Sequence, residues 1–234
     1  MRSAKGCIEE IFLDQTRAAR LSCTPGLTPA PGEYLLASVE NDPAALAYPI
    51  FQAGPAPAGF FVAPPLPFSS EAFWYPGQTL SLRGPYGHGF DLPIAARRVA
   101  LIDFSANCAR LLALLPLAMR QKTAVTLLSD NPPAGLPSAI EISPLSALAE
   151  TAAWADYLAL DLARASIENL LPLISLHLKG ANAQALISTP LPCASMAECG
   201  VCSIRTRKGY RLACKNGPVF DVSELRVGME WLRT

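Results

Sequence analysis

Four of the seven cysteines fall in one short stretch of the chain, and their spacing suggests metal chemistry. Cys193, Cys199, Cys202 and Cys214 follow the pattern C-x5-C-x2-C-x11-C. Thiolates bind zinc and iron–sulfur clusters, and a plant-type [2Fe–2S] loop has the spacing C-x4-C-x2-C with a distant fourth cysteine. The first gap here is one residue longer than in that loop. The spacing predicts that these four residues bind a [2Fe–2S] cluster.

Gly200 stands between two of these cysteines, at a point where backbone N–H groups must turn toward sulfur. Glycine tolerates the dihedral angles that such a turn demands. The N–H donors stabilise the negative charge of an iron–thiolate centre. The alternatives are structural zinc and ordinary buried thiols. Zinc sites usually have two CxxC-like pairs, whereas Cys193 and Cys214 lack a near partner, so the pattern favours iron–sulfur and leaves both alternatives open.

Composition excludes several classes of function. The 234 residues are 51% hydrophobic, which is enough for one large domain, or two small ones, plus a short module. The 19 basic and 19 acidic residues balance and form no basic stripe, which argues against nucleic acid as a partner. No apolar run could span a membrane, and the first ten residues do not resemble a secretion signal. We expect a cytoplasmic protein whose cysteines form no disulfide framework.

The chain divides into three segments of different character, which predict three domains. Residues 1–97 contain short runs of strand-forming residues between Pro- and Gly-rich turns, the pattern of a small antiparallel barrel. Residues 98–189 alternate strand and helix patterns, which predicts a parallel sheet with helices on both faces. Residues 190–234 carry the cysteine cluster but too few apolar residues for a core of their own. We expect a metal to organise this last module.

The expected elements are short, and proline interrupts two of them. The barrel strands are expected at 7–13, 33–39, 59–62 and 79–82. The sheet strands are expected at 99–102, 124–128, 157–160 and 185–187, and the helices at 107–121 and 167–178. Pro116 and Pro172 lie inside those helices, where each predicts a kink or a helix start.

Sequence motifs in all three segments resemble one protein family. The segment CKNGPVFD (214–221) resembles the cluster domain of the electron-transfer subunit of NAD-linked dihydroorotate dehydrogenase. The segment LRGPYGHGF (82–90) resembles that family's Gly-Pro-x-Gly-x-Gly-Phe sequence at the exit from the barrel. The turn PGEY (31–34) resembles its Pro-Gly-Gln-Phe turn. The resemblance covers nearly the whole chain in the same order.

This resemblance implies a ferredoxin-reductase-like fold, with FAD between the barrel and the nucleotide domain. It also implies that NADH reduces FAD and that the [2Fe–2S] centre passes single electrons to a catalytic flavoprotein subunit in a hetero-oligomer. That partner oxidises dihydroorotate in pyrimidine biosynthesis. The residues that would bind FAD by this resemblance are Tyr48, Pro49, Ile50, Gly84 and Gly87.

Two departures from the family pattern concern the nucleotide cofactors. The family's Arg-x-Tyr-Ser motif, which holds the FAD pyrophosphate, corresponds to residues 46–52, and these contain no arginine. Because arginine makes charge-assisted contacts to phosphate, its absence predicts weak FAD binding. The turn at 103–110 has no glycine to let the backbone approach a phosphate, and Asp103 adds negative charge there. We therefore expect that NAD binding is lost.

Two functions are consistent with these features. The first is an electron-transfer subunit of an oxidoreductase, which needs a catalytic partner. The second is a non-enzymatic accessory or scaffold protein of the same fold, with a structural metal module. The intact cysteines favour the first, and the altered nucleotide motifs favour the second. Five basic residues near the cysteines predict either a solvated face or a docking surface for an acidic partner: Arg205, Arg207, Lys208, Arg211 and Lys215.

Overall fold

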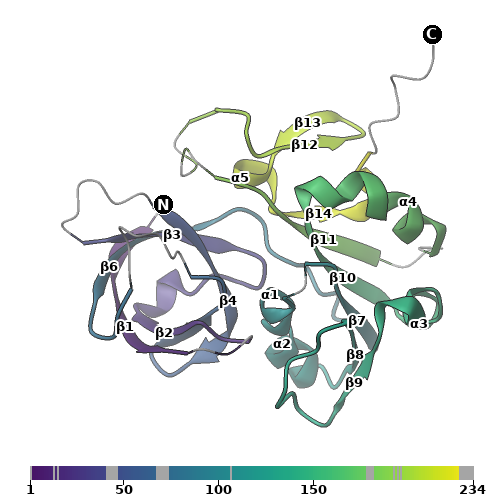
Figure 1. The fold of residues 1–234 in the computed structure, drawn as a ribbon, viewed down its shortest axis with the longest axis horizontal. Helices are drawn as coiled ribbons and strands as arrows, with labels where there is room; N and C mark the ends of the chain where they lie inside the picture. The colour runs from purple at the N-terminus through teal and green to yellow at the C-terminus, as the bar shows by residue number, and fades with distance from the viewer. Residues whose placement is uncertain are drawn as a thin grey trace.

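The first part of the chain forms a closed six-stranded barrel (Figure 1). The computed structural model describes residues 2–12, 14, 16–40, 47–66, 74–105, 107–177, 182–191, 193, 195 and 197–226. In order round the barrel, the strands are β1 (Arg2–Ile11), β2 (Ala19–Cys23), β5 (Gly59–Val62), β4 (Tyr48–Ala56), β3 (Tyr34–Val39) and β6 (Thr79–Tyr86). All six neighbouring pairs are antiparallel, which confirms the predicted barrel.

Two barrel strands lie where the sequence predicted none. Strand β4 contains Pro49 and Pro55, residues that normally argue against a strand because they lack a backbone N–H. Pro55 follows a register shift in the pairing with β5, between Gln52 and Gly54, whereas Pro49 lies in the regular pairing with β3, opposite Leu36. Strand β2 is only five residues long. The expected strands at 33–39, 59–62 and 79–82 correspond to β3, β5 and β6, and 7–13 overlaps β1, although residue 13 lies outside the described residues.

The second part of the chain forms a six-stranded sheet in the order β14-β11-β10-β7-β8-β9. Its strands are β7 (Arg98–Asp103), β8 (Ala124–Leu128), β9 (Ile140–Ser143), β10 (Tyr157–Ala163), β11 (Asn182–Ser188) and β14 (Val219–Asp221). All pairs are parallel except β11 with β14. The four expected strands are confirmed as β7, β8, β10 and β11. Strand β14, which comes from the C-terminal segment, completes the sheet edge.

Helices cover both faces of this sheet, as predicted. They are α1 (Ala109–Leu112), α2 (Leu115–Arg120), α3 (Leu148–Trp154) and α4 (Ile167–His177). Alternate residues of β7 point to opposite cores: Val99 and Leu101 pack with α1 and α2, whereas Ala100 and Ile102 pack with α3 and α4. None of the helices in the described part of the chain is long and apolar enough to cross a bilayer.

Proline divides the helix expected at 107–121 into two. Pro116 occupies the first turn of α2, where its missing N–H costs no helical hydrogen bond. Pro172 lies inside α4, whose expected end at residue 178 is outside the described residues. Short 3-10 turns connect other elements: η1 (Pro25–Leu27), η2 (Leu145–Ala147), η3 (Arg164–Ser166) and η4 (Val222–Glu224).

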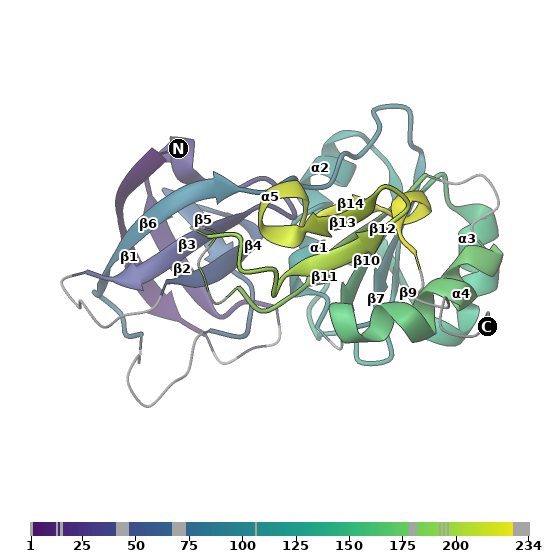
Figure 2. The same cartoon turned by 90° about the horizontal axis from the view of Figure 1, so that it is seen from above.

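The C-terminal module lies over the junction of the barrel and the sheet (Figure 2). It consists of a hairpin, β12 (Ser203–Thr206) with β13 (Gly209–Leu212), followed by α5 (Ala213–Asn216) and β14. Its buried side chains, among them Cys202, Ile204 and Phe220, share one core with the sheet and α4. The module therefore adds its few apolar residues to an existing core, which the low apolar content of its sequence did not reveal.

Gly87 connects the barrel to the C-terminal module. Its φ is +79°, and a Cβ added to it would clash with the Gly217 carbonyl oxygen and lie 2.7 Å from Pro218 Cδ. Next to it, the backbone N–H of His88 donates to Gly217 O at 2.6 Å. The close contact between the backbone at the barrel exit and the backbone of the C-terminal module therefore requires a residue without a side chain at position 87.

We expect Gly87→Ala to destabilise the fold, because alanine is strained at this φ and has no space. The matched control is Gly77→Ala, since Gly77 has a similar φ of +86° but open space around it. Overpacking should make Gly87→Ala less stable than the control by about 1–3 kcal/mol. Urea unfolding curves of the two variants measure the difference. If the two variants lost the same free energy of unfolding, the close contact of residue 87 with Gly217 and Pro218 would make no difference to stability.

Candidate metal centre and the adjoining cavity

The structure brings the four predicted ligands together as two pairs. Cys193 lies beside Cys199, and Cys202 lies beside Cys214, close enough for each pair of thiols to interact. Cys214 also lies close enough to Cys193 for their charges to interact. Within the described residues, no three His, Cys, Asp or Glu side chains are arranged to hold a single metal ion. The thiols thus gather in one place, but pairwise and not around one point.

The β12–β13 hairpin creates the second pair. Cys202 immediately precedes β12, and Cys214 lies in α5 immediately after β13. The hairpin register places Ser203 opposite Leu212, and Ala213 N donates to Cys202 O at 2.9 Å. Two cysteines separated by eleven residues in sequence therefore become neighbours.

The two pairs differ in environment. Cys202 and Cys214 are buried, whereas Cys199 is exposed and Cys193 is partly buried. Burial, with a smaller contribution from Cys202, raises the pKa of Cys214 to about 11. A backbone hydrogen bond with Ala197, and then the Cys199 side chain, lowers the pKa of Cys193. A bound cation would favour the thiolate form of all four.

Gly200 has the dihedral angle that the sequence predicted. Its φ is +76°, in the left-handed region that glycine adopts readily. An added Cβ would meet no other atom within 4 Å, so the requirement for glycine is conformational and not steric. The four thiols and this turn form a donor set that fits an iron–sulfur group.

A buried tyrosine of the barrel contacts this centre, and sequence reasoning did not single it out. The Tyr34 hydroxyl lies 2.6 Å from Ser195 Oγ and donates to the Cys214 carbonyl oxygen at 3.1 Å. Burial raises the pKa of Tyr34 to about 12, so the hydroxyl keeps its proton at neutral pH. The residue lies in the PGEY turn, but that motif carries no information about a contact with residues 161 and 180 positions away.

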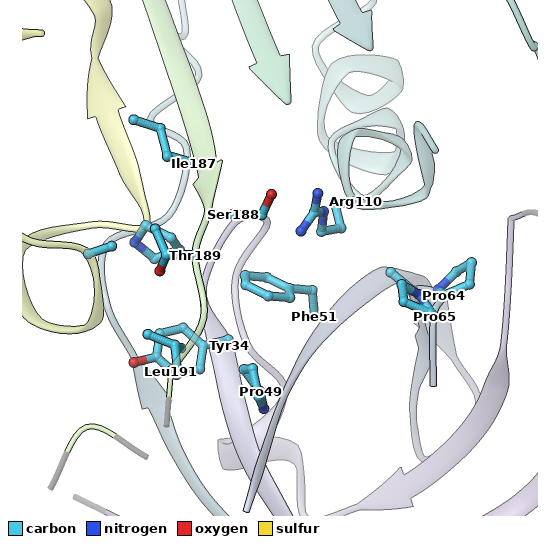
Figure 3. Close-up of a pocket in the computed structure, with 13 residues that line it drawn as sticks. Tyr34, Pro49, Phe51, Pro64, Pro65, Arg110, Ile187, Ser188, Thr189 and Leu191 are labelled. Atoms are coloured by element: carbon cyan, nitrogen blue, oxygen red, sulfur yellow. The ribbon is translucent and has the colours of Figure 1, made fainter. Parts of the chain in front are cut away.

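A cavity of about 170 Å³ opens where the barrel, the sheet and the C-terminal module meet (Figure 3). The residues that line it are mostly apolar: Tyr34, Pro49, Phe51, Ala63, Pro64, Pro65, Arg110, Ile187, Ser188, Thr189, Leu191, Ala213 and Pro218. In Figure 3, Arg110 enters from α1 above the ring of Phe51, with Ser188 beside it. The walls suit a flat, apolar ring.

The cation in the cavity wall is already paired. Arg110 donates to Asp161 through Nε at 2.7 Å and through Nη2 at 2.6 Å. The Asp161 side chain is 0% exposed, and its desolvation raises its pKa to about 6 although Arg110 opposes the shift. Arg110 also stacks 5.4 Å from the centre of the Phe51 ring. Among the described residues that line the cavity, Arg110 is the only cation, and its guanidinium is engaged by Asp161.

The five residues that the resemblance assigns to FAD are not all at the cavity. Pro49 lines it, and Tyr48 precedes Pro49 on β4. Ile50 points into the barrel core. A Cβ on Gly84 would lie 2.8 Å from Leu35 Cδ2, and Gly87 packs against the C-terminal module. Residue 46 of the corresponding segment lies outside the described residues. Their role in FAD binding stays a prediction.

The turn after β7 is filled by the carboxylate of Asp103. Its Oδ1 accepts from Ser105 N at 2.9 Å, from Ser105 Oγ at 2.9 Å and from Asn107 N at 3.2 Å. Its Oδ2 accepts from Ser129 Oγ at 3.1 Å. In dinucleotide-binding folds the N–H groups of this turn bind phosphate. Here the buried carboxylate of Asp103 accepts hydrogen bonds from two N–H groups of this turn, those of Ser105 and Asn107.

We expect this chain not to bind NADH, because Asp103 both occupies the N–H donors and repels a phosphate. Isothermal titration of the purified protein with NADH should give no heat of binding up to millimolar concentration. The same titration with NADPH extends the test to a second dinucleotide. Saturable binding of either nucleotide with a Kd in the micromolar range would contradict the prediction.

Several of the basic residues near the centre are paired. Lys215 Nζ lies 2.6 Å from Glu198, and Lys208 and Arg211 lie 3.8 and 3.6 Å from Glu224. Tyr210, at the tip of the hairpin, is 74% exposed. These ion pairs reduce the net charge of the face.

Comparison with known proteins supports an iron–sulfur cluster in the C-terminal module. Residues 197–226 match the family model of the iron–sulfur cluster binding domain of dihydroorotate dehydrogenase B. The match includes Cys199, Cys202 and Cys214, and Cys193 lies just before it. A search of curated proteins gives no match.

Several solved structures share the fold. One belongs to a study of NADH-dependent reduced ferredoxin-NADP oxidoreductase, with a TM-score of 0.73, 13% identity, and coverage of 95% of this chain and 90% of that one. The ferredoxin reductase of carbazole 1,9a-dioxygenase has a TM-score of 0.59 at 16% identity, over 77% of this chain and 66% of its own. The FAD/NAD binding domain of nitric oxide dioxygenase from Vibrio cholerae has a TM-score of 0.53 at 13% identity, over 80% and 98%.

At these identities the likeness establishes the fold, which is ferredoxin-reductase-like, as predicted. The family match supports an iron–sulfur cluster and a role in electron transfer. The family model covers residues 197–226, and the likeness to solved structures extends over most of the chain.

Proposed function

We propose that this chain is the electron-transfer subunit of a dihydroorotate dehydrogenase-like oxidoreductase and holds a [2Fe–2S] cluster on Cys193, Cys199, Cys202 and Cys214. The observation that carries the proposal is that the thiols lie close together in two pairs, 193 beside 199 and 202 beside 214, in a segment that matches an iron–sulfur binding domain. A [2Fe–2S] cluster has two irons, with two protein ligands on each. A structural zinc ion needs four ligands converging on one point. The observed pairs suit the two-iron centre better.

The surroundings of the thiols suit transfer to a protein partner. Such a cluster, when bound, accepts and releases one electron at a time. Cys199 is exposed, and its neighbour Val201 is 41% exposed, so a partner can approach one edge of the centre closely. We propose a catalytic flavoprotein subunit as this partner, in a cytoplasmic hetero-oligomer that serves pyrimidine biosynthesis. Tyr210 and the basic residues of the hairpin would lie at the rim of that contact.

An anaerobic preparation of the full chain tests the proposal. We expect broad visible absorption that dithionite bleaches, with about two iron and two sulfide ions per chain. Flavin analysis of the same sample, after denaturation, measures FAD loading. A colourless protein with one zinc ion would sink the proposal. Co-purification with a dihydroorotate dehydrogenase catalytic subunit, and its reduction through the chain, tests the partner.

A second candidate function rests on the closed turn after β7. Because Asp103 takes the phosphate-binding N–H groups, the sheet domain could serve only as a scaffold. In that case the chain would be a non-enzymatic accessory protein with a structural metal module. The two functions differ in one measurement, since only the electron-transfer subunit has a centre that is reduced and reoxidised reversibly.

A further inference from the structure

We propose that Tyr34 and Ser195 form a hydrogen-bonded clamp through which the barrel positions Cys214. The inference rests on the proposed function, in which Cys214 is the fourth cluster ligand. Tyr34 comes from β3, and Ser195 lies between the first two ligands in sequence. Neither residue is a ligand, so both are positioning residues.

Two hydrogen bonds join Tyr34 to the other two residues. Tyr34 Oη donates to the Cys214 carbonyl oxygen at 3.1 Å and lies 2.6 Å from Ser195 Oγ. The Ser195 side chain also lies beside the Cys214 thiol. One tyrosine thus holds both the segment between Cys193 and Cys199 and the backbone of α5.

The backbone of Ser195 needs such support. Its φ is +61°, in the left-handed region that costs a residue with a side chain of the order of 1 kcal/mol. The hydrogen bond between the Ser195 and Tyr34 hydroxyls offsets this cost and favours the conformation. Glycine would adopt the same angle more easily but would lack the hydroxyl.

Tyr34 is itself held rigidly. Its side chain is 0% exposed, and its ring lies 5.7 Å from the rings of both Phe51 and Tyr86. Phe51 and Tyr34 also line the cavity (Figure 3). Tyr34 therefore belongs both to the wall of the cavity and to the clamp on Cys214, so the two sites share one rigidly held side chain.

The test compares three variants of the full chain. Tyr34→Phe keeps the ring and removes the hydroxyl, and Ser195→Ala removes the other hydroxyl. The matched control is Tyr157→Phe, because Tyr157 is also buried and donates to Gln184 at 2.6 Å in the sheet domain. Loss of about two hydrogen bonds should accelerate iron loss to a chelator roughly tenfold in Tyr34→Phe, and the control should lose iron at the wild-type rate.

Two further measurements separate positioning from a general loss of stability. Ser195→Ala should lower the midpoint potential, because it removes a polar hydroxyl from beside the Cys214 sulfur, and a less polar surrounding disfavours the added negative charge of the reduced cluster. In the metal-free chain, Tyr34→Phe should speed amide hydrogen exchange at residues 197–202 and 213–217 about tenfold, without changing exchange in β10. Equal exchange, chelator rates and potentials in all variants would overturn the clamp. A wild-type chain without iron or sulfide would instead overturn the proposed function.

Discussion

Replacing Cys202 by serine should reduce the iron and sulfide content of the purified protein to background. Cys202 is 2% exposed and forms a pair with Cys214, so its loss removes one of the two ligands from one iron. A serine hydroxyl is a far poorer ligand for iron in such a cluster. The visible absorption should disappear together with the iron, and metal analysis measures both effects on one sample.

The controls separate ligand loss from the loss of a buried thiol. Cys108 is also 2% exposed, and burial raises its pKa to about 12, so it is inert and lies outside the ligand set. Cys108→Ser should therefore keep its iron even if it loses stability. Cys23→Ser, in the barrel, should keep iron as well. Equal iron content in the Cys202 and Cys108 variants would refute the ligand assignment.

Arg110→Met should destabilise the fold strongly, and more at high pH than at low pH. The substitution leaves the Asp161 carboxylate, which is 0% exposed, without its cation. Breaking a buried ion pair in this way costs about 3–5 kcal/mol when the remaining group is charged. Urea unfolding at pH 8 should show this loss.

The direction of the pH effect follows from the pKa of Asp161. Desolvation already raises this pKa from 3.8 to about 6, and removal of Arg110 raises it further. Above pH 4 the folded variant then binds more protons than the unfolded chain, so its stability falls as pH rises toward the new pKa. The difference in stability between wild type and variant should therefore narrow as the pH is lowered.

Two further variants control for this effect. The double variant Arg110→Met/Asp161→Asn removes the buried charge and should recover most of the stability at pH 8. Arg98→Met breaks the exposed pair with Asp156, in which the arginine side chain is 47% exposed, and should cost little. If the single Arg110 variant were as stable as wild type at both pH values, the ion pair would have no role in the fold.

The features that could be read from sequence are those carried by local spacing and periodicity. The continuous apolar run in β7 predicts a buried strand of a parallel sheet, and the short strands between turns in the first segment predict a barrel. Strand β4 was missed because Pro49 and Pro55 contradict strand propensity, although Pro49 pairs with Leu36 of β3 and Pro55 pairs with Phe60 of β5. Strand propensity is a property of one segment, whereas strand pairing depends on two segments that can lie far apart in the sequence.

The functional sites also combine features that are visible in the sequence with contacts that only the fold creates. Asp103 is visible in the sequence as an unsuitable charge after β7, but not as an acceptor for the N–H groups of its own turn. Arg110 and Asp161 lie 51 positions apart with no motif to connect them. Their pairing arises because α1 packs at the end of β10, a contact that no local pattern encodes.

The sequence by itself contained the four cysteines that we propose as ligands and their spacing, because both are properties of the chain and do not depend on the fold. It also determined the turn at Gly200, because few other residues adopt that angle. Only the tertiary structure decided how the thiols pair, because the register of β12 against β13 places Cys202 beside Cys214. It alone decided that the Tyr34 hydroxyl of the barrel contacts Ser195 and Cys214, because these distances of 2.6 and 3.1 Å arise only when the barrel packs against the C-terminal module.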